Sequence, residues 1–333
     1  MTAALAVQGQ DLGCDRNALD SLERKALDAM EAREYPLAEQ RFREAFKVCP
    51  EKRSILLNLA QAQVSGRNFD DAVRTAKLYL ASDSKSTTGR VMLANAYLMS
   101  LRLKDALAAA NVILQDHPDE AAALKIRANA EYLLGEVGTA KDTFIRLLDR
   151  YPDDEDGAYM LGRIYYQEGY LELAIGQFQR VLKMNPDSYK AIDNLGLCYE
   201  AQGDFEVATR YFLTAIKLVE KNHPDYESPY ANLADLLLKT GDPQRAFDAA
   251  SKATNRNPMS ARSFYLGAKA LNQLGKTELS LNWLQRAAAL NSTSSETWYL
   301  LGIVYRKLQQ NDKAEEAIGK FRELLAREPS RRR

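Results

Sequence analysis

Small residues recur along this chain at a nearly constant spacing, and no other feature of the sequence limits its fold as strongly. The step between successive members of the first column is 34 residues, except between Gly196 and Ala234, where it is 38. A second column follows twelve residues after each member of the first. A period of this length indicates a repeat architecture with one supersecondary unit per period. The first column comprises Ala26, Ala60, Ala94, Ala128, Gly162, Gly196, Ala234, Ala268 and Gly302, and the second Ala38, Ala72, Ala106, Ala140, Ala174, Ala208, Ala246, Ser280 and Ala314.

Each period reads as two amphipathic helices joined by a tight turn. Leu161, Gly162 and Tyr165 share one helix face, as do Ala174 and Phe178 one helix later, because residues three or four apart are neighbours on a helix surface. Small residues at the crossing let the two backbones approach closely. Gly residues near five of the turns can take the positive φ that ends a helix, and Pro closes many periods. One hairpin leaves an apolar face uncovered, so neighbouring hairpins must stack.

Two segments carry a resemblance to a known family. Residues 158–165, AYMLGRIY, are followed by Gly169, Ala174, Phe178 and Pro186, and residues 298–305, WYLLGIVY, by Ala314. With nine copies in phase, the chain resembles the tetratricopeptide repeat family over residues 19–328. The resemblance implies an all-α fold, a right-handed α-solenoid (superhelix) of about nine helix-turn-helix repeats. Four positions depart from the pattern: polar residues replace the usual apolar or aromatic ones at Lys25, Gln63, Arg127 and Glu131.

The repeats divide the chain into three expected parts. We expect a leader at residues 1–18, a single solenoid at 19–328 and a basic tail at 329–333. The leader is either a disordered segment or the remnant of an export signal, since residues 1–7 lack the basic start and full apolar stretch of a signal peptide. Repeats are expected to start near residues 19, 53, 87, 121, 155, 189, 227, 261 and 295. The four extra residues of the long step fall at about 220–227 and lengthen a helix end or the turn after it.

Composition argues against several functional classes. Lys and Arg number 45, as do Asp and Glu, so the net charge is zero and supplies no field for nucleic acid. No apolar run approaches the roughly 20 residues of a membrane span. The two histidines, His117 and His223, each precede Pro at a predicted helix end. No phosphate loop, nucleophile elbow or metal-ligand spacing is found. The sequence therefore predicts no enzyme, no cofactor and no metal.

The cysteines leave one question open. Cys14 and Cys49 flank the first predicted hairpin, whose two ends should lie close together. They can form a disulfide only in an oxidising compartment and otherwise stay reduced. Cys198 falls in a helical core pattern and is expected to be a buried small hydrophobe.

In the tetratricopeptide family the first helix of each hairpin lines a concave groove that binds peptides or partner helices. This resemblance implies a groove with one or more candidate residues from most repeats. An incomplete asparagine row (Asn58, Asn194 and Asn232) resembles rows that bond a peptide backbone. A second set resembles part of a carboxylate clamp for acidic chains and comprises Lys125, Asn129, Lys190 and Asn194. The competing interpretation of these polar residues is that they form a solvent-exposed surface that binds no dedicated ligand. The candidates are Asn58, Asn95, Lys125, Asn129, Tyr159, Arg163, Lys190, Asn194, Asn232, Tyr265 and Lys269.

The function expected from these features is that of a scaffold or adaptor. It would bind a protein or peptide, including one with an acidic or C-terminal carboxylate segment. The alternative is a regulatory or substrate-presenting subunit of a separately encoded enzyme or of a secretion or assembly complex. The sequence fixes neither the partner nor the oligomeric state. The location is cytoplasmic by default, or exported if residues 1–7 end a truncated signal.

Overall fold

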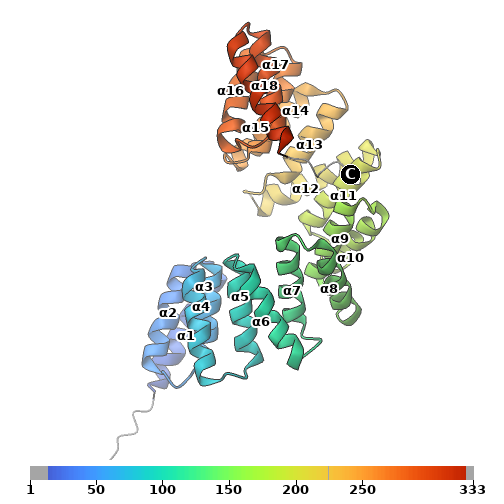
Figure 1. The fold of residues 1–333 in the computed structure, drawn as a ribbon. Coiled ribbons are helices and arrows are strands. Elements are labelled where there is room, and N and C mark those ends of the chain that lie inside the picture. Colours follow the sequence, from blue (N-terminus) through green and yellow to red (C-terminus); the bar gives the residue numbers. More distant parts are fainter. Residues whose placement is uncertain (1–13, 224, 328–333) are drawn as a thin grey trace, which may run out of the picture. The chain divides into compact units, whose positions relative to one another are not determined.

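The computed structural model describes residues 14–223 and 225–327, and in these residues it consists of eighteen α-helices without a strand (Figure 1). None of the described helices is long and apolar enough to span a membrane. The all-α repeat fold expected from the sequence is therefore confirmed. The helices are α1 Arg16–Glu31, α2 Tyr35–Val48, α3 Ser54–Ser65, α4 Phe69–Ser82, α5 Thr87–Met99, α6 Leu103–Asp116, α7 Ala121–Leu134, α8 Val137–Arg150, α9 Glu155–Glu168, α10 Leu171–Met184, α11 Tyr189–Ala201, α12 Phe205–Asn222, α13 Ser228–Lys239, α14 Pro243–Arg256, α15 Ala261–Gln273, α16 Thr277–Leu290, α17 Ser295–Lys307 and α18 Asn311–Ala326.

Odd-numbered helices are the first helices of the hairpins and even-numbered helices are the second ones. Within a hairpin the two pack closely because the small-residue columns lie at the crossing. A Cβ atom added to Gly162 would lie 2.8 Å from Cε1 of Phe178, and one added to Gly196 would lie 2.5 Å from Cε1 of Phe212. Both phenylalanine rings are fully buried. The aromatic side chain of the second helix thus occupies the space that glycine leaves on the first.

The turns inside the hairpins use the left-handed backbone conformation. Gly135 ends α7 with φ of 86°, and four other turns also use Gly. The remaining four turns reach a similar φ at Arg33, Arg67, Leu101 and Gln309. A side chain at positive φ costs more than glycine does, so in these turns hairpin packing outweighs the local preference.

Two of the unusual polar residues, the half-buried Arg127 and the buried Glu131, form an ion pair at positions where the repeat usually has an apolar and an aromatic residue. Glu131 is 2% exposed, and its carboxylate accepts a hydrogen bond of 2.7 Å from Nε of Arg127. Its other oxygen accepts one of 2.8 Å from the hydroxyl of Thr143 on α8. Because a buried carboxylate needs such donors, Arg127 and Glu131 are explained together.

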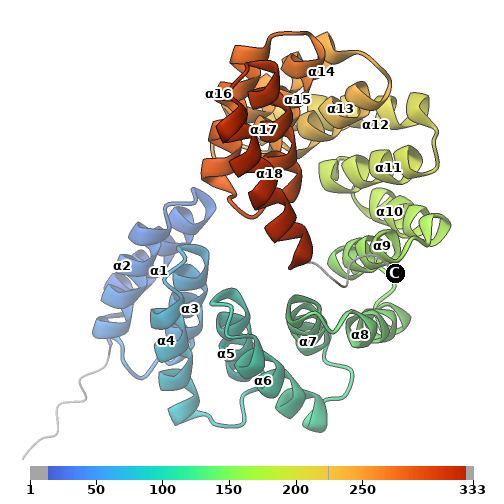
Figure 2. The same cartoon turned by 45° about the horizontal axis from the view of Figure 1, so that its top comes forward.

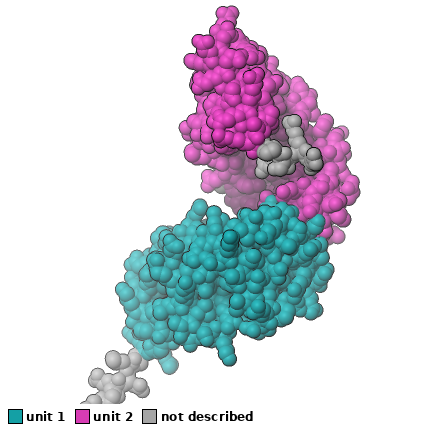
Figure 3. Space-filling view, in the orientation of Figure 1, with its two compact units in different colours: residues 1–157 teal, residues 158–333 magenta. Residues whose placement is uncertain are grey.

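The chain divides into two compact units, residues 1–157 and 158–333, with the boundary inside α9 (Figure 3). Each unit is a stack of hairpins in chain order, as Figure 2 shows. In unit 1 one buried cluster joins α1, α2 and α3, and another runs from α3 to α7. In unit 2 one cluster spans α12 to α15 and a second spans α15 to α18. From α1 to α7 and from α12 to α18, burial thus continues from one hairpin to the next, as stacking of repeats requires.

The first helix begins earlier than the sequence suggested. We expected a leader up to residue 18, but residues 16–18 form the first turn of α1. The side chain of Asp15 accepts a hydrogen bond of 3.0 Å from the amide of Ala18, which caps the helix. Residues 1–13 of the leader, residue 328 and the whole basic tail at 329–333 lie outside the described residues.

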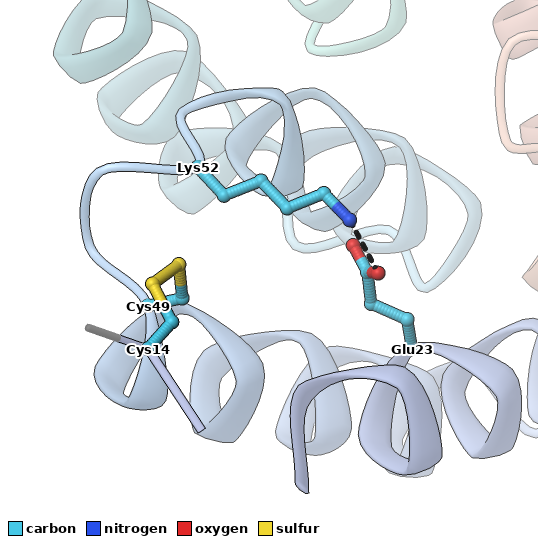
Figure 4. Close-up of a disulfide and its surroundings, with 4 residues drawn as sticks. All are labelled: Cys14, Glu23, Cys49 and Lys52. Atoms are coloured by element: carbon cyan, nitrogen blue, oxygen red, sulfur yellow. Dashed lines mark hydrogen bonds and ion pairs between the residues drawn. A yellow bond between two sulfur atoms is a disulfide. The ribbon is translucent and has the colours of Figure 1, made fainter. Parts of the chain in front are cut away.

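A disulfide closes the first hairpin at its open end (Figure 4). Cys14 precedes α1 and Cys49 follows α2, and their Cα atoms are 4.9 Å apart. Nearby, Nζ of Lys52 lies 2.7 Å from a carboxylate oxygen of Glu23, which links α1 to the segment before α3. The disulfide and the ion pair together fasten α1 to the chain that follows it. Cys198 is a free, fully buried thiol.

The four extra residues of the long repeat add one turn of helix. Whereas most second helices contain 14 residues, α12 contains 18 and ends at Asn222. The segment from His223 to Glu227 then leads into α13. His223 and Tyr226, which follow the longer helix, pack against Tyr189 on the first helix α11.

Candidate partner-binding surface

Within each unit the first helices lie closer together than the second helices. The pairs α3–α5 and α5–α7 in unit 1, and α11–α13, α13–α15 and α15–α17 in unit 2, are in contact. Consecutive second helices do not approach one another to the same extent. Each unit therefore curves toward its first helices, and their outward-facing side chains form what we call the first-helix face.

In unit 1 the predicted groove residues are largely engaged by the chain itself. Nζ of Lys125 lies 3.0 Å from Asp154 and 3.6 Å from Asp156. Burial lowers the pKa of Lys125, but the hydrogen bond and charge of Asp154 outweigh it, so the net pKa is raised. The amide of Asn129 donates to the backbone oxygen of Lys125 at 2.8 Å. Any external carboxylate must therefore compete with two internal ones.

The other two groove candidates in unit 1 are Asn58 and Asn95. Asn58 on α3 is exposed, and Asn95 on α5 is half-buried. Both belong to first helices, as expected.

In unit 2, α9 and α11 present a connected polar and aromatic edge. The amide of Asn194 donates to the backbone oxygen of Lys190 at 2.8 Å and to the hydroxyl of Tyr159 at 3.3 Å. The guanidinium of Arg163 lies 6.0 Å from the centroid of the Tyr159 ring. Burial raises the pKa of Tyr159, so its hydroxyl keeps its proton.

At the centre of this face three side chains from three first helices form a hydrogen-bonded chain. Nη1 of Arg262 on α15 donates to Oδ1 of Asn232 on α13 at 2.7 Å. Nδ2 of Asn232 donates to Oδ1 of Asp193 on α11 at 2.9 Å. Asp193 is 2% exposed and Asn232 is 3% exposed, whereas Arg262 is exposed. Burial raises the pKa of Asp193 to about 7, against the opposing effects of Asn232 and Arg262.

Aromatic rings surround one side of this chain. The ring centroid of Tyr189 lies 4.3 Å from that of His223 and 4.8 Å from that of Tyr226. Burial raises the pKa of Tyr226, and the nearby Asp193 raises it further. The segment that follows the longer helix α12 therefore contributes directly to the surroundings of Asp193.

Three cations on the same face have no carboxylate within ion-pair distance among the described residues: Lys190, Arg262 and Lys269. The neighbouring Lys239 differs, because its Nζ lies 2.7 Å from Glu200 and 3.1 Å from Asp235. Arg262, Tyr265 and Lys269 share one face of α15, since they are spaced three and four residues apart. Burial raises the pKa of Tyr265 to about 12, so it stays a neutral donor.

The members of each predicted set of groove residues, the clamp and the asparagine row, differ in where they lie or in how they are used. The clamp residues Lys125 and Asn129 belong to unit 1, while Lys190 and Asn194 belong to unit 2. In the asparagine row, Asn232 is buried and uses its amide inside the protein, unlike the exposed Asn58. Asn232 thus holds Arg262 and Asp193 in place through hydrogen bonds and is not itself available to a peptide.

Sequence reasoning missed Asp193, Arg262, Tyr189 and Tyr226. The 38-residue step did not point to them, because its four extra residues form an additional turn of α12 and none of the four missed residues lies there.

Metal-donor atoms converge in one place in the described part of the chain. Sulfur or oxygen atoms of Cys14, Cys49 and Glu51 lie within 4.8 Å of one another. Since both sulfurs are joined in the disulfide, they offer no thiolate for a metal.

Comparison with known proteins identifies the family. Tetratricopeptide repeat models match residues 23–87, 91–155, 134–189, 189–259, 232–295 and 295–321. The chain belongs to the tetratricopeptide repeat family. Nothing among curated proteins matches the sequence.

One solved structure shows the same fold at low sequence identity, and two others are similar over part or most of the chain. A chain of the APC/C hetero-tetramer Cut9–Hcn1 is 15% identical with a TM-score of 0.68, and the match covers 90% of this chain. This tetratricopeptide repeat protein spans only 57% of that chain. A tetratricopeptide repeat protein from Parabacteroides merdae ATCC 43184 is 18% identical with a TM-score of 0.47, and the match covers 86% of this chain and 99% of that one. MamA from Desulfovibrio magneticus RS-1 is 20% identical with a TM-score of 0.44, over 53% of this chain and 98% of that one.

Proposed function

We propose that this protein is a non-enzymatic scaffold or adaptor that binds a peptide or partner protein on the first-helix face of unit 2. Tetratricopeptide repeats serve as protein-interaction modules, and here they fill nearly the whole described chain. Tyr159 and Tyr265 supply aromatic contact area on this face, and tyrosine gives large contact area at a low cost in conformational entropy.

The partner segment is acidic or ends in a carboxylate. The observation that carries this proposal is the set of three cations without ion-pair partners in the described chain: Lys190 on α11, and Arg262 and Lys269 on α15, the second first helix after it. Of the carboxylates nearby, Asp193 is buried and Glu200 and Asp235 are already bonded, whereas Glu296 on α17 is exposed, acts electrostatically on Tyr265 and forms no ion pair with the three cations. An external carboxylate would therefore meet positive charge without displacing an internal one, in contrast to Lys125 in unit 1.

A binding comparison on the full chain tests this proposal. Fluorescence anisotropy would compare a labelled oligoglutamate peptide with an oligolysine peptide of the same length. The expected result is binding of oligoglutamate alone, with at least a tenfold loss of affinity in Lys190→Glu/Lys269→Glu, or about 1.4 kcal/mol. The matched control is Lys217→Glu/Lys252→Glu, which reverses two exposed charges on the second helices α12 and α14. Equal loss in both double variants would contradict a dedicated surface.

The same variants separate an adaptor from a subunit of an enzyme complex. Affinity capture from the source organism, with the wild type and both double variants as baits, would be followed by mass spectrometry. An adaptor yields partners lost only with Lys190→Glu/Lys269→Glu. An enzyme activity that co-purifies in the same selective way would instead favour the regulatory or substrate-presenting role.

A further inference from the structure

Arg262 differs from the other two cations on the first-helix face of unit 2 in how it is held. Its Nη1 is tied to Asn232 at 2.7 Å, and Asn232 is in turn tied to the buried Asp193 at 2.9 Å. A guanidinium has five N–H donors in a planar fork, so one anchored donor leaves others to meet a ligand. A side chain fixed in this way loses less conformational freedom on binding than a lysine does.

Asp193 can influence Arg262 without touching it. No ion pair joins the two in the described structure, because Asn232 lies between them. The titratable and charged groups that face Asp193 are Tyr159 from α9, Tyr226 and Glu227 from the segment before α13, and Arg262 from α15. Of these, Arg262 is the only cation, so a negative charge on Asp193 acts mainly on it.

We propose, on the basis of the function inferred above, that Arg262 anchors a carboxylate of the acidic partner and that protonation of Asp193 controls the strength of this anchor. With Asp193 neutral, the positive charge of Arg262 faces the partner without opposition. With Asp193 ionised, its charge attracts Arg262 and repels the incoming carboxylate. The surface thereby responds to pH through a residue that never contacts the ligand.

The direction of the effect follows from the buried carboxyl group. Because burial places the pKa of Asp193 at about 7, its charge changes over the neutral range. Affinity for an acidic peptide should be high at pH 6 and lower at pH 8. Two unit charges about 10 Å apart, with the ligand on the water-exposed side and an effective dielectric constant of about 35, give a change on the order of fivefold. A bound carboxylate also raises the pKa of Asp193, so binding near pH 7 takes up protons.

The experiment measures the affinity of the full chain for the labelled oligoglutamate peptide at a series of pH values. Asp193→Asn keeps an acceptor for Asn232 but cannot ionise, so its affinity should be the same at pH 6 and pH 8. Arg262→Gln should bind weakly at every pH, and its matched control is Arg210→Gln on the second helix α12. Because the imidazole of His223 lies in the same cluster, His223→Gln must retain the wild-type pH dependence. Circular dichroism confirms folding of each variant.

The outcomes separate this inference from the proposed function. A fall in wild-type affinity of about fivefold that disappears in Asp193→Asn supports it. Tight binding of oligoglutamate that does not depend on pH, or an unchanged pH dependence in Asp193→Asn, overturns the control by Asp193 but leaves the acidic partner in place. Wild-type affinity in Arg262→Gln overturns the anchor. Absence of oligoglutamate binding at every pH overturns the proposed function itself.

Discussion

The side-chain amide of Asn232 donates a hydrogen bond of 2.9 Å to the carboxylate of Asp193, a residue 39 positions earlier on the neighbouring first helix. Asn194 occupies the position equivalent to Asn232 in the preceding repeat, yet its amide donates to Lys190 and Tyr159 on the half-buried edge of the face. The same residue type therefore has two roles in adjacent repeats. The 38-residue step between them lengthens α12 by one turn.

Replacing Asp193 should change the pH dependence of stability. Burial raises the folded pKa of Asp193 from 3.8 to about 7, so the folded state binds a proton more tightly than the unfolded state. Wild-type stability should then fall as pH rises from about 4 to 7. Asp193→Asn should match the wild type below pH 4 and exceed it at pH 8 by a margin on the order of 2–4 kcal/mol. Urea unfolding at several pH values measures this, and parallel curves for the two proteins would contradict it.

Opening the disulfide should destabilise the first hairpin selectively. The bond between Cys14 and Cys49 closes a loop with a sequence separation of 35 residues, which corresponds to about 3–4 kcal/mol of lost unfolded-state entropy. Hairpins of a solenoid contact only their neighbours, so α1 and α2 should lose hydrogen-exchange protection first. The comparison is wild type with and without reductant, and the control is Cys14→Ala/Cys49→Ala, which should not respond to reductant. Uniform protection in reduced and oxidised protein would argue against this role.

Filling the crossing at Gly162 should destabilise unit 2. A Cβ atom there would already lie 2.8 Å from the Phe178 ring, and a leucine would overpack the site at a cost of about 1–3 kcal/mol. Gly176 on α10 provides the control, because a Cβ added there meets nothing within 4 Å. Gly176→Ala should stabilise the helix by about 0.5–1 kcal/mol. Thermal melts that shift equally for the two variants would refute the close crossing.

Lys125 and Lys269 should differ in their contributions to stability. Lys125→Gln removes the ion pairs with Asp154 and Asp156 and should lower stability by about 0.5–1 kcal/mol. Lys269 has no such pair in the described chain, so Lys269→Gln should change stability by less than about 0.5 kcal/mol. Urea titrations in low and high salt check both values, and the effect at Lys125 should shrink in high salt. A larger loss of stability for Lys269→Gln than for Lys125→Gln would mean that Lys269 does form a stabilising ion pair.

The sequence predicted the repeat fold because the fold depends on many equivalent positions. The columns starting at Ala26 and Ala38 are fully buried at nearly every member, so periodicity alone identified the hairpins. The start of α1 was placed too late because the cap at Asp15 precedes the first repeat motif. The sequence could not decide whether Cys14 and Cys49 form a disulfide, since pairing depends on the redox state of the compartment as well as on proximity.

The candidate surface was less predictable than the fold. Lys190 and Tyr159 could be placed on a first helix from spacing alone. Asp193 could not be singled out, because an acidic residue in a groove column usually lies in solvent. Its burial arises from Asn232 on the next first helix and from Tyr226 in the connection before it, which are contacts between repeats. The ion pair between Lys125 and Asp154 could not be predicted either, because it joins α7 to the residue that directly precedes the next first helix, α9.

The central claim, that the partner binds the first-helix face of unit 2, is tested most directly by site-specific photo-crosslinking. Benzoylphenylalanine would replace Tyr265 on α15, between Arg262 and Lys269, or replace the exposed Leu213 on the second helix α12. Each protein would be irradiated with the labelled oligoglutamate peptide under conditions where anisotropy shows binding. We predict crosslinking at position 265 and none at 213. Crosslinking at 213, or bound peptide that fails to react at 265, would contradict the account.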